Sequence, residues 1–128
     1  MDPTLEQVAR HGIVPVVVID DAAVAPALVG ALSEGGLPVA EFTFRTTAAA
    51  EAIRAATAAQ PEALIGAGSV LDPSQVDAAV DAGARFIVSP GIDEDVVRRA
   101  QAEKDTVLPS PLITIDNVER FYNPDSVF

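Results

Sequence analysis

The segment "VAEFTFRTT", from Val39 to Thr47, carries polar side chains at alternate positions. If the segment is a β-strand, Glu41, Thr43 and Arg45 share one face, because successive side chains point to opposite sides of a strand. A carboxyl group can transfer protons, a hydroxyl can hydrogen-bond, and a guanidinium matches the two oxygens of a carboxylate. The pattern therefore indicates either a site for an acidic substrate or a strand face that meets water.

Short runs rich in β-branched residues recur along the chain at intervals of about 20 to 25 residues, which is the length of one βα unit. The segments between them are rich in alanine and long enough for helices. This alternation predicts a parallel sheet covered by helices. The expected strands begin at Ile13, Pro38, Ala63, Ala84 and Thr106.

In a parallel sheet covered by helices, plain exposure of a polar strand face is the less available choice. We therefore expect Glu41, Thr43 and Arg45 to line a concave site at the C-terminal end of the second strand. "GAGSV" and "VSPG" place Ser69 and Pro90 at the ends of the next two strands. Tight turns between strand and helix explain the same residue types without any ligand, so for these two segments both interpretations stay open.

Helix start signals agree with the βα pattern. In "LDPSQVDAAVDAG", Asp72 can cap a helix that begins with Pro73 and ends before Gly83, with Gln75 at the capping-box position. The other expected helices begin at Asp20 or Asp21, at Thr46 or Thr47, and at Asp93.

The composition excludes several classes of function. A formal charge of −11, from 8 basic and 19 acidic residues, disfavours a nucleic-acid or anionic-membrane partner. The chain has no cysteine and no apolar stretch long enough to span a bilayer, and its first residues lack the pattern of a leader. His11 is the only histidine, and no carboxylate cluster shows ligand spacing. We expect a soluble cytoplasmic protein with no metal and no cofactor.

Two architectures fit the repeated unit. At 128 residues a flavodoxin-like sheet would be complete, whereas a (β/α)8 barrel would be about half built, with four to five βα units. The flavodoxin-like fold would need a phosphate-binding loop after the first strand, and "VIDDAAV" places two acids there. Periodicity alone does not choose between the two.

The composition changes near residue 102. Residues 103–128 contain no alanine and no glycine, and three of the six aromatic residues lie in the last eight positions. This shift predicts a boundary between residues 1–102 and a divergent segment of residues 103–128.

Three motifs together, "EFTFRT", "GAGSVL" and "SPG", resemble those of the 2-keto-3-deoxy-6-phosphogluconate (KDPG) and 4-hydroxy-2-oxoglutarate (KHG) aldolases. The resemblance runs from about Gly12 to Ala100. It implies a partial (β/α)8 TIM barrel and an aldehyde-lyase of class I, which works without metal and is typically a trimer. A lysine of that family forms a Schiff base with pyruvate or with the keto group of the sugar acid.

The resemblance also implies roles for single residues. Glu41 would transfer protons as the catalytic residue. Arg45 and Ser69 would bind the carboxylate of pyruvate or of another 2-keto acid, although the family usually has threonine where this chain has Ser69. Pro90 would line the same pocket, where the alternation along the strand also places Thr43 as a substrate-binding residue. The physical properties agree, since a buried carboxyl group suits acid and base catalysis and arginine suits a carboxylate.

One family feature has no counterpart in the sequence. The Schiff-base lysine lies in a segment resembling "KFFPA", whereas the only lysine of this chain is Lys104, ahead of the expected fifth strand. We therefore expect the chain to be an N-terminal half of such an aldolase, inactive alone, because the covalent step needs the amine. The alternative is a half-barrel binding or assembly module that pairs with itself or with a partner through open sheet edges.

Overall fold

The computed structural model describes residues 2–102 of the chain. The predicted fifth strand from Thr106, the only lysine, Lys104, and the C-terminal aromatic residues lie outside these residues. The boundary near residue 102 stays a prediction, because the described part stops there.

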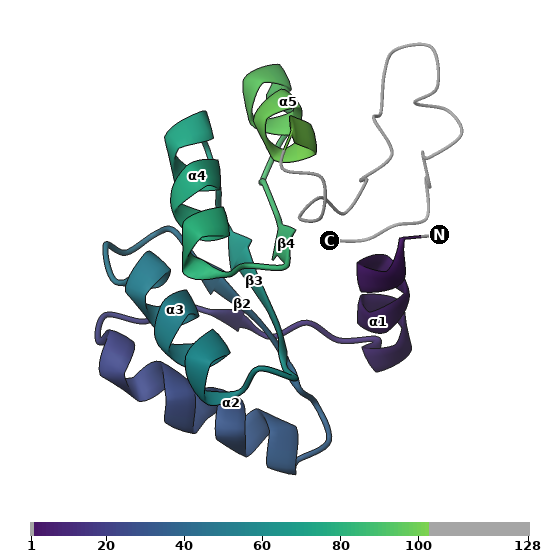
Figure 1. The fold of residues 1–128 in the computed structure, drawn as a ribbon, viewed down its shortest axis with the longest axis vertical. Helices are drawn as coiled ribbons and strands as arrows, with labels where there is room; N and C mark the ends of the chain where they lie inside the picture. Colours follow the sequence, from purple (N-terminus) through teal and green to yellow (C-terminus); the bar gives the residue numbers. More distant parts are fainter. Residues whose placement is uncertain (1, 103–128) are drawn as a thin grey trace, which may run out of the picture.

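Four parallel strands form one sheet in residues 2–102, in the order β1, β2, β3, β4 (Figure 1). Each strand therefore lies beside its neighbour in the chain, as in a (β/α) barrel, whereas a flavodoxin-like sheet has the order 2-1-3-4-5. The α/β class and the parallel sheet are confirmed, and the flavodoxin-like alternative is wrong. The strands are Val16–Val17 (β1), Val39–Thr43 (β2), Leu64–Gly68 (β3) and Phe86–Ile87 (β4).

The helices that follow the strands pack side by side over one face of the sheet (Figure 1). The first of these helices contacts the second, the second contacts the third, and the third contacts the fourth. They are α2 (Ala25–Glu34), which follows the short 3-10 helix η1 (Ala22–Val24), then α3 (Ala49–Ala59), α4 (Pro73–Ala82) and α5 (Glu94–Ala102).

Another helix, α1 (Pro3–His11), lies on the other side of the sheet and is not among the predicted elements (Figure 1). The Asp2 carboxylate caps it by accepting hydrogen bonds from the backbone N–H groups of Thr4 and Leu5. Gly12 ends it with a left-handed φ of 71°, which costs glycine little. The side chain of Val8 packs against the apolar cluster on that face of the sheet.

Side chains of β2 alternate between the two faces, as the sequence predicts. Ala40 and Phe42 belong to the large core under the helices. Val39 instead joins Leu64 and Phe86 in a smaller cluster on the face that α1 covers. Every residue of β2 is buried, so burial alone does not tell the polar face from the apolar one.

The predicted helix starts hold at Asp72 and Asp93, hold at Asp21 for η1 rather than for α2, and fail before α3. Asp72, Asp93 and Asp21 each accept a hydrogen bond from a backbone N–H of the following turn. Helix α3 begins at Ala49, and its N-cap residue is Ala48, whose side chain has no polar atom to cap the helix. The hydroxyl of Thr46 instead donates to the carbonyl oxygen of Ile19, at 2.6 Å, so the loop before α3 is held to the loop that follows β1.

Gly66 makes room for the ring of Phe86. Its partner in the ladder on β4 is Phe86 itself, and a Cβ atom at residue 66 would overlap that buried ring. We expect Gly66→Ala to destabilise the fold by about 1–3 kcal/mol, the usual cost of overpacking. Denaturant unfolding would measure this cost. Gly91→Ala is the matched control, because a Cβ there meets nothing within 4 Å, and an equal loss in both variants would contradict the packing argument.

Candidate active site

The candidate site lies at the C-terminal ends of β2 and β3. Glu41 occupies the middle of β2, between Val16 of β1 and Gly66 of β3. Its backbone N–H donates to the carbonyl oxygen of Pro15, at 2.9 Å, which fixes the strand against β1. The Glu41 residue is only 8 % exposed.

The carboxyl group of Glu41 lies directly over the backbone of Gly68. A Cβ atom at residue 68 would overlap the Glu41 carboxyl oxygen Oε1 and its Cδ atom. Gly68 is therefore the residue that lets the acid lie flat on β3. This glycine of "GAGSV" thus permits a close approach, and the group that approaches is a side chain of the neighbouring strand.

Burial raises the pKa of the Glu41 carboxyl above its ordinary value, while the positive charge of Arg45 opposes the rise. Desolvation is the larger of the two effects. Burial removes water from the carboxyl group, which disfavours its charged form. Glu41 thus combines a fixed position with an increased affinity for a proton. Both are properties of a general acid and base.

Arg45 and Ser69 meet across the loops that follow β2 and β3. The Arg45 Nε atom donates a hydrogen bond of 3.3 Å to the Ser69 hydroxyl oxygen. The two loops are also joined through the backbone, where the N–H of Phe44 donates to the carbonyl oxygen of Gly68 at 2.8 Å. Arg45 lies beyond the end of β2 and is exposed, so its remaining N–H groups can meet an anion.

The backbone of Ser69 adopts a left-handed conformation, with φ of 54°. It is the only residue other than glycine with a positive φ among residues 2–102. Such a conformation costs a residue with a Cβ atom about 1–2 kcal/mol, and strained residues of this kind gather at functional sites. Here the strain sets the serine hydroxyl beside the guanidinium.

Thr43 and Pro90 differ in how they relate to this group. Thr43 is 1 % exposed on the same face as Glu41, and its hydroxyl has no hydrogen-bond partner in the described part of the chain. Pro90 is exposed in the loop after β4 and shares only the sheet edge with the others. The loops of β3 and β4 are joined by a hydrogen bond from the Val70 N–H to the Val88 carbonyl oxygen.

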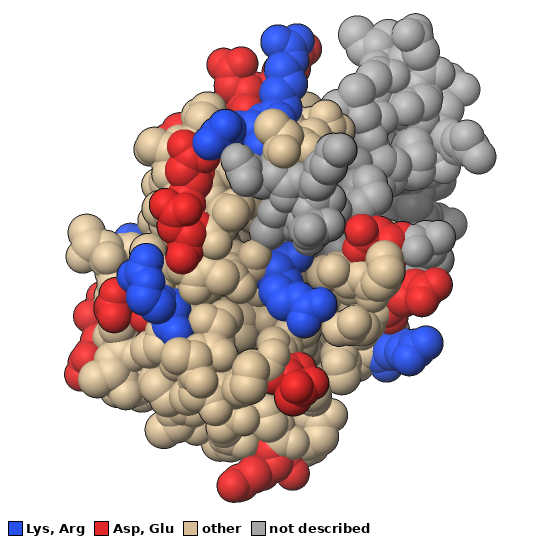
Figure 2. All heavy atoms as spheres, in the orientation of Figure 1, with Lys and Arg blue, Asp and Glu red and all other residues tan. Residues whose placement is uncertain are grey.

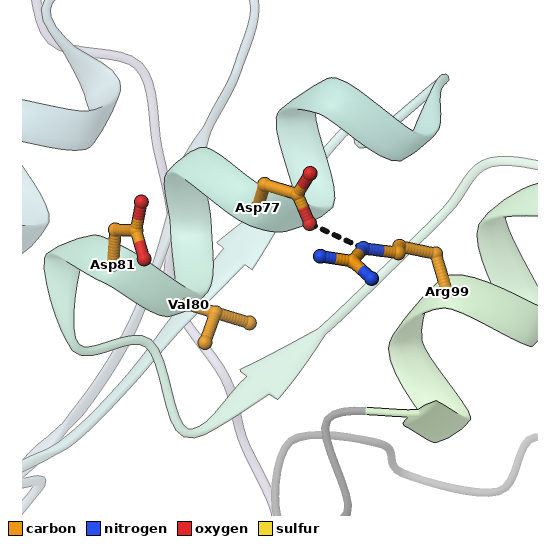
Figure 3. A pocket seen from close by; sticks show the side chains of 4 residues that line it. All are labelled: Asp77, Val80, Asp81 and Arg99. Carbon is orange, nitrogen blue, oxygen red and sulfur yellow. Dashed lines mark hydrogen bonds and ion pairs between the residues drawn. The ribbon is translucent and has the colours of Figure 1, made fainter.

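A hollow lies away from this edge, between α4 and α5 (Figure 3). Asp77 of α4 and Arg99 of α5 form an ion pair there, with Val80 and Asp81 beside it. Charged side chains of both signs gather over these two helices (Figure 2). Exposed ion pairs of this kind join helices weakly and supply no buried reactive group, so the hollow is a poor candidate for an active site.

Residues 2–102 hold no cluster of three or more metal-binding side chains. None of the helices in this part is both long and apolar enough to cross a membrane.

Comparison with known proteins gives matches to aldolases. Residues 5–120 match the family described as "KDPG and KHG aldolase". A 2-dehydro-3-deoxy-phosphogluconate aldolase of Haemophilus influenzae is 43 % identical over 97 residues, which are 76 % of this chain and 46 % of that protein. The KHG/KDPG aldolase of Escherichia coli K12 is 40 % identical over the same share of both chains.

Solved structures agree with these matches. The KDPG aldolase of Zymomonas mobilis ZM4, solved with 3-phosphoglycerate, is 44 % identical with a TM-score of 0.68, over 74 % of this chain and 45 % of that one. The KDPG aldolase of Legionella pneumophila, solved with pyruvate captured as a covalent carbinolamine intermediate, is 34 % identical with a TM-score of 0.72, over 84 % and 52 %. The chain spans about half the length of the curated relatives it matches.

The raised pKa of Glu41 predicts a loss of stability as the pH rises. The folded state holds its proton more tightly than the unfolded chain, so stability falls from about pH 4.5 upward until the folded carboxyl has ionised. Each unit of difference between the two pKa values is worth about 1.4 kcal/mol. Glu41→Gln removes this loss, so the variant should be more stable than the parent at pH 7 and similar to it near pH 4.

Thermal or denaturant unfolding across this pH range measures the effect. Glu62→Gln, which removes a charge from an exposed turn, serves as the control and should show no such pH-dependent gain. If Glu41→Gln tracks the control at every pH, the carboxyl is not desolvated as described.

Proposed function

Because the chain belongs to the KDPG and KHG aldolase family, we propose that it carries the pyruvate-handling half of a class I aldolase site. The reaction of such a site is the cleavage of a 2-keto-3-deoxy sugar acid phosphate to pyruvate and an aldehyde. The observation that carries this proposal is the buried acid Glu41 next to the Arg45–Ser69 pair at one edge of the sheet. A relative solved with a covalent pyruvate carbinolamine supports the substrate class.

The proposed roles follow from the chemistry of each group. Arg45 and Ser69 would hold the carboxylate of the keto acid, since both offer hydrogen-bond donors and the guanidinium adds a positive charge. Glu41 would give a proton to the terminal methylene carbon of the pyruvate enamine, which becomes the methyl group, and would take the proton back in the reverse direction. A substrate carboxylate on Arg45 would also neutralise the charge that opposes the raised pKa of Glu41. Pro90 would line the pocket from the next loop.

The nucleophilic amine is not part of this proposal for the chain. The only lysine in the 128 residues is Lys104, ahead of the predicted fifth strand, and that side of a barrel usually serves stability. We propose that the chain binds pyruvate without turning it over unless another polypeptide segment supplies the amine. The division at residue 102, a cytoplasmic location and a family-like trimer belong to the same proposal, although the family match itself extends across residue 102 to residue 120.

A second role is favoured by the open edge of β1, which has a neighbouring strand on one side only in the described part of the chain. Val16 is the ladder partner of Glu41 and is 58 % exposed, which is high for valine in a parallel sheet. Val18, just after β1, is 53 % exposed. An unpaired strand with exposed apolar side chains favours association. The chain would then act as a half-barrel module that assembles with itself or with a complementary half.

Pyruvate binding tests the first role. We expect Arg45→Ala to weaken pyruvate affinity by about tenfold to a hundredfold, because a charge-assisted hydrogen bond is worth about 1.5–3 kcal/mol. Calorimetry or ligand-observed NMR measures the affinity. Arg54→Ala is the control, since that exposed arginine pairs with Glu51 on α3, and its affinity should equal that of the parent. Equal weakening in both variants would count against the proposed carboxylate site.

Borohydride reduction in the presence of pyruvate tests the missing amine. We expect intact mass spectrometry to find the chain unmodified, because Lys104 is not proposed to reach the substrate. A relative that carries the complete barrel is the positive control. A stable adduct on Lys104 would overturn the claim that the chain lacks a usable nucleophile.

Light scattering across a range of protein concentrations tests the assembly role. We expect the mass to rise with concentration if the β1 edge pairs, and Val16→Lys to reduce the association, because a charge on an edge strand opposes pairing. Arg85→Lys, an exposed residue before β4, controls for handling. A compact monomer at every concentration would remove this second role.

A further inference from the structure

Thr43 holds the one buried side-chain polar atom without a hydrogen-bond partner in residues 2–102. Thr43 is only 1 % exposed, and its hydroxyl oxygen is buried from solvent. Leaving a buried hydroxyl unpaired is costly, and native structures keep such groups rarely. A valine has the same shape and would avoid this cost, which indicates that the hydroxyl serves a purpose.

The ladder between β2 and β3 shows which group lies within its reach. Thr43 is the partner of Gly68 in that ladder, and Glu41 lies two residues before it on the same strand face. The Glu41 carboxyl oxygen Oε1 occupies the place of a Cβ atom on Gly68. The Glu41 carboxyl group therefore lies over the ladder partner of Thr43, on the strand face that the two side chains share.

The spacing of a sheet allows a hydrogen bond between them. Neighbouring strands lie about 4.8 Å apart, and an O–H···O hydrogen bond spans about 2.7 Å between its oxygens. Rotation about the Cα–Cβ bond of Thr43 changes the position of its hydroxyl oxygen without moving the backbone. In the structure as it stands the two groups are not bonded.

The other neighbours of Glu41 offer few hydrogen-bonding groups to its carboxyl group. Its ladder partners are Val16 on β1 and Gly66 on β3, and neither side chain carries a polar group. Arg45 is the charged group whose field reaches Glu41, and its Nε atom is bonded to Ser69. Thr43 is thus the neutral hydrogen-bonding side chain that shares the strand face and the glycine with the acid.

We propose that Thr43 is the positioning residue for the Glu41 carboxyl group, and that it does not itself contact the substrate. Its hydroxyl donates a hydrogen bond to the carboxylate after Glu41 has given its proton to the substrate carbon. When Glu41 takes the proton back, the hydroxyl is released to the unpaired state seen here. The proton moves only between Glu41 and the substrate, and Thr43 keeps its own hydrogen throughout.

This inference rests on the proposed function for its role in the reaction, but the interaction itself does not need catalysis. While Glu41 is protonated, the unpaired Thr43 hydroxyl lowers the stability of the fold. When Glu41 ionises, the hydrogen bond from Thr43 restores that stability. Thr43 would therefore limit how far burial raises the proton affinity of Glu41. Without it, a buried carboxylate next to apolar groups would regain its proton too readily to act as a base.

A carboxyl titration of the full chain, labelled with 13C at the glutamate side chains, tests the proposal. The Glu41 signal is assigned by its absence in Glu41→Gln. We expect Thr43→Val to raise the proton affinity of Glu41 about tenfold, the effect of losing one hydrogen bond to the charged form. Thr43→Ser, which keeps the hydroxyl, should titrate like the parent.

Thr57→Val is the matched control, because the Thr57 hydroxyl on α3 bonds to the carbonyl oxygen of Ile53 and lies away from the site. It should leave the Glu41 titration unchanged. The proposal is overturned if Thr43→Val titrates like the parent in a folded protein, or if Thr43→Ser and Thr43→Val shift the midpoint equally. Pyruvate binding measured in the same samples separates the two claims, since its absence would refute the proposed function and leave the titration result standing.

Discussion

The contact between the Glu41 carboxyl group and the backbone of Gly68 is the constraint on which the candidate site depends. Only a residue without a Cβ atom lets the acid lie against β3, and a side chain at that position would push it toward solvent. Lying there, the carboxyl loses water and binds its proton more tightly. The position and the proton affinity of the acid therefore have one structural cause.

The rest of the fold holds that contact in place. The register of β2 on β3 sets Thr43 opposite Gly68, and Gly66 leaves space for the ring of Phe86 two ladder positions earlier. Helices cover one face of the sheet. On the other face, α1 packs against the small cluster of Val39, Leu64 and Phe86. The polar groups are left at the end of the strands where the loops bring Arg45 and Ser69 together.

Much of this arrangement can be predicted from the sequence, because it depends on local patterns. Alternation in "VAEFTF" predicts which side chains share a face, and Asp72 with Gly83 marks both ends of α4. The same signals, Asp2 and Gly12, also mark α1, which the βα repeat does not predict because this helix precedes the first strand. The unpaired hydroxyl of Thr43 and the bond from Thr46 to Ile19 depend on tertiary contacts, so no local pattern reveals them.

The central claim is that this sheet edge binds the keto acid with its carboxylate on Arg45 and its methyl group toward Glu41. The most direct measurement is the set of intermolecular NOEs between the methyl protons of pyruvate and the assigned side chains of the protein. The account predicts contacts to the side chains of Glu41 and Ser69. Contacts confined to the hollow between α4 and α5, around Val80, or the absence of any contact at saturating pyruvate, would contradict it.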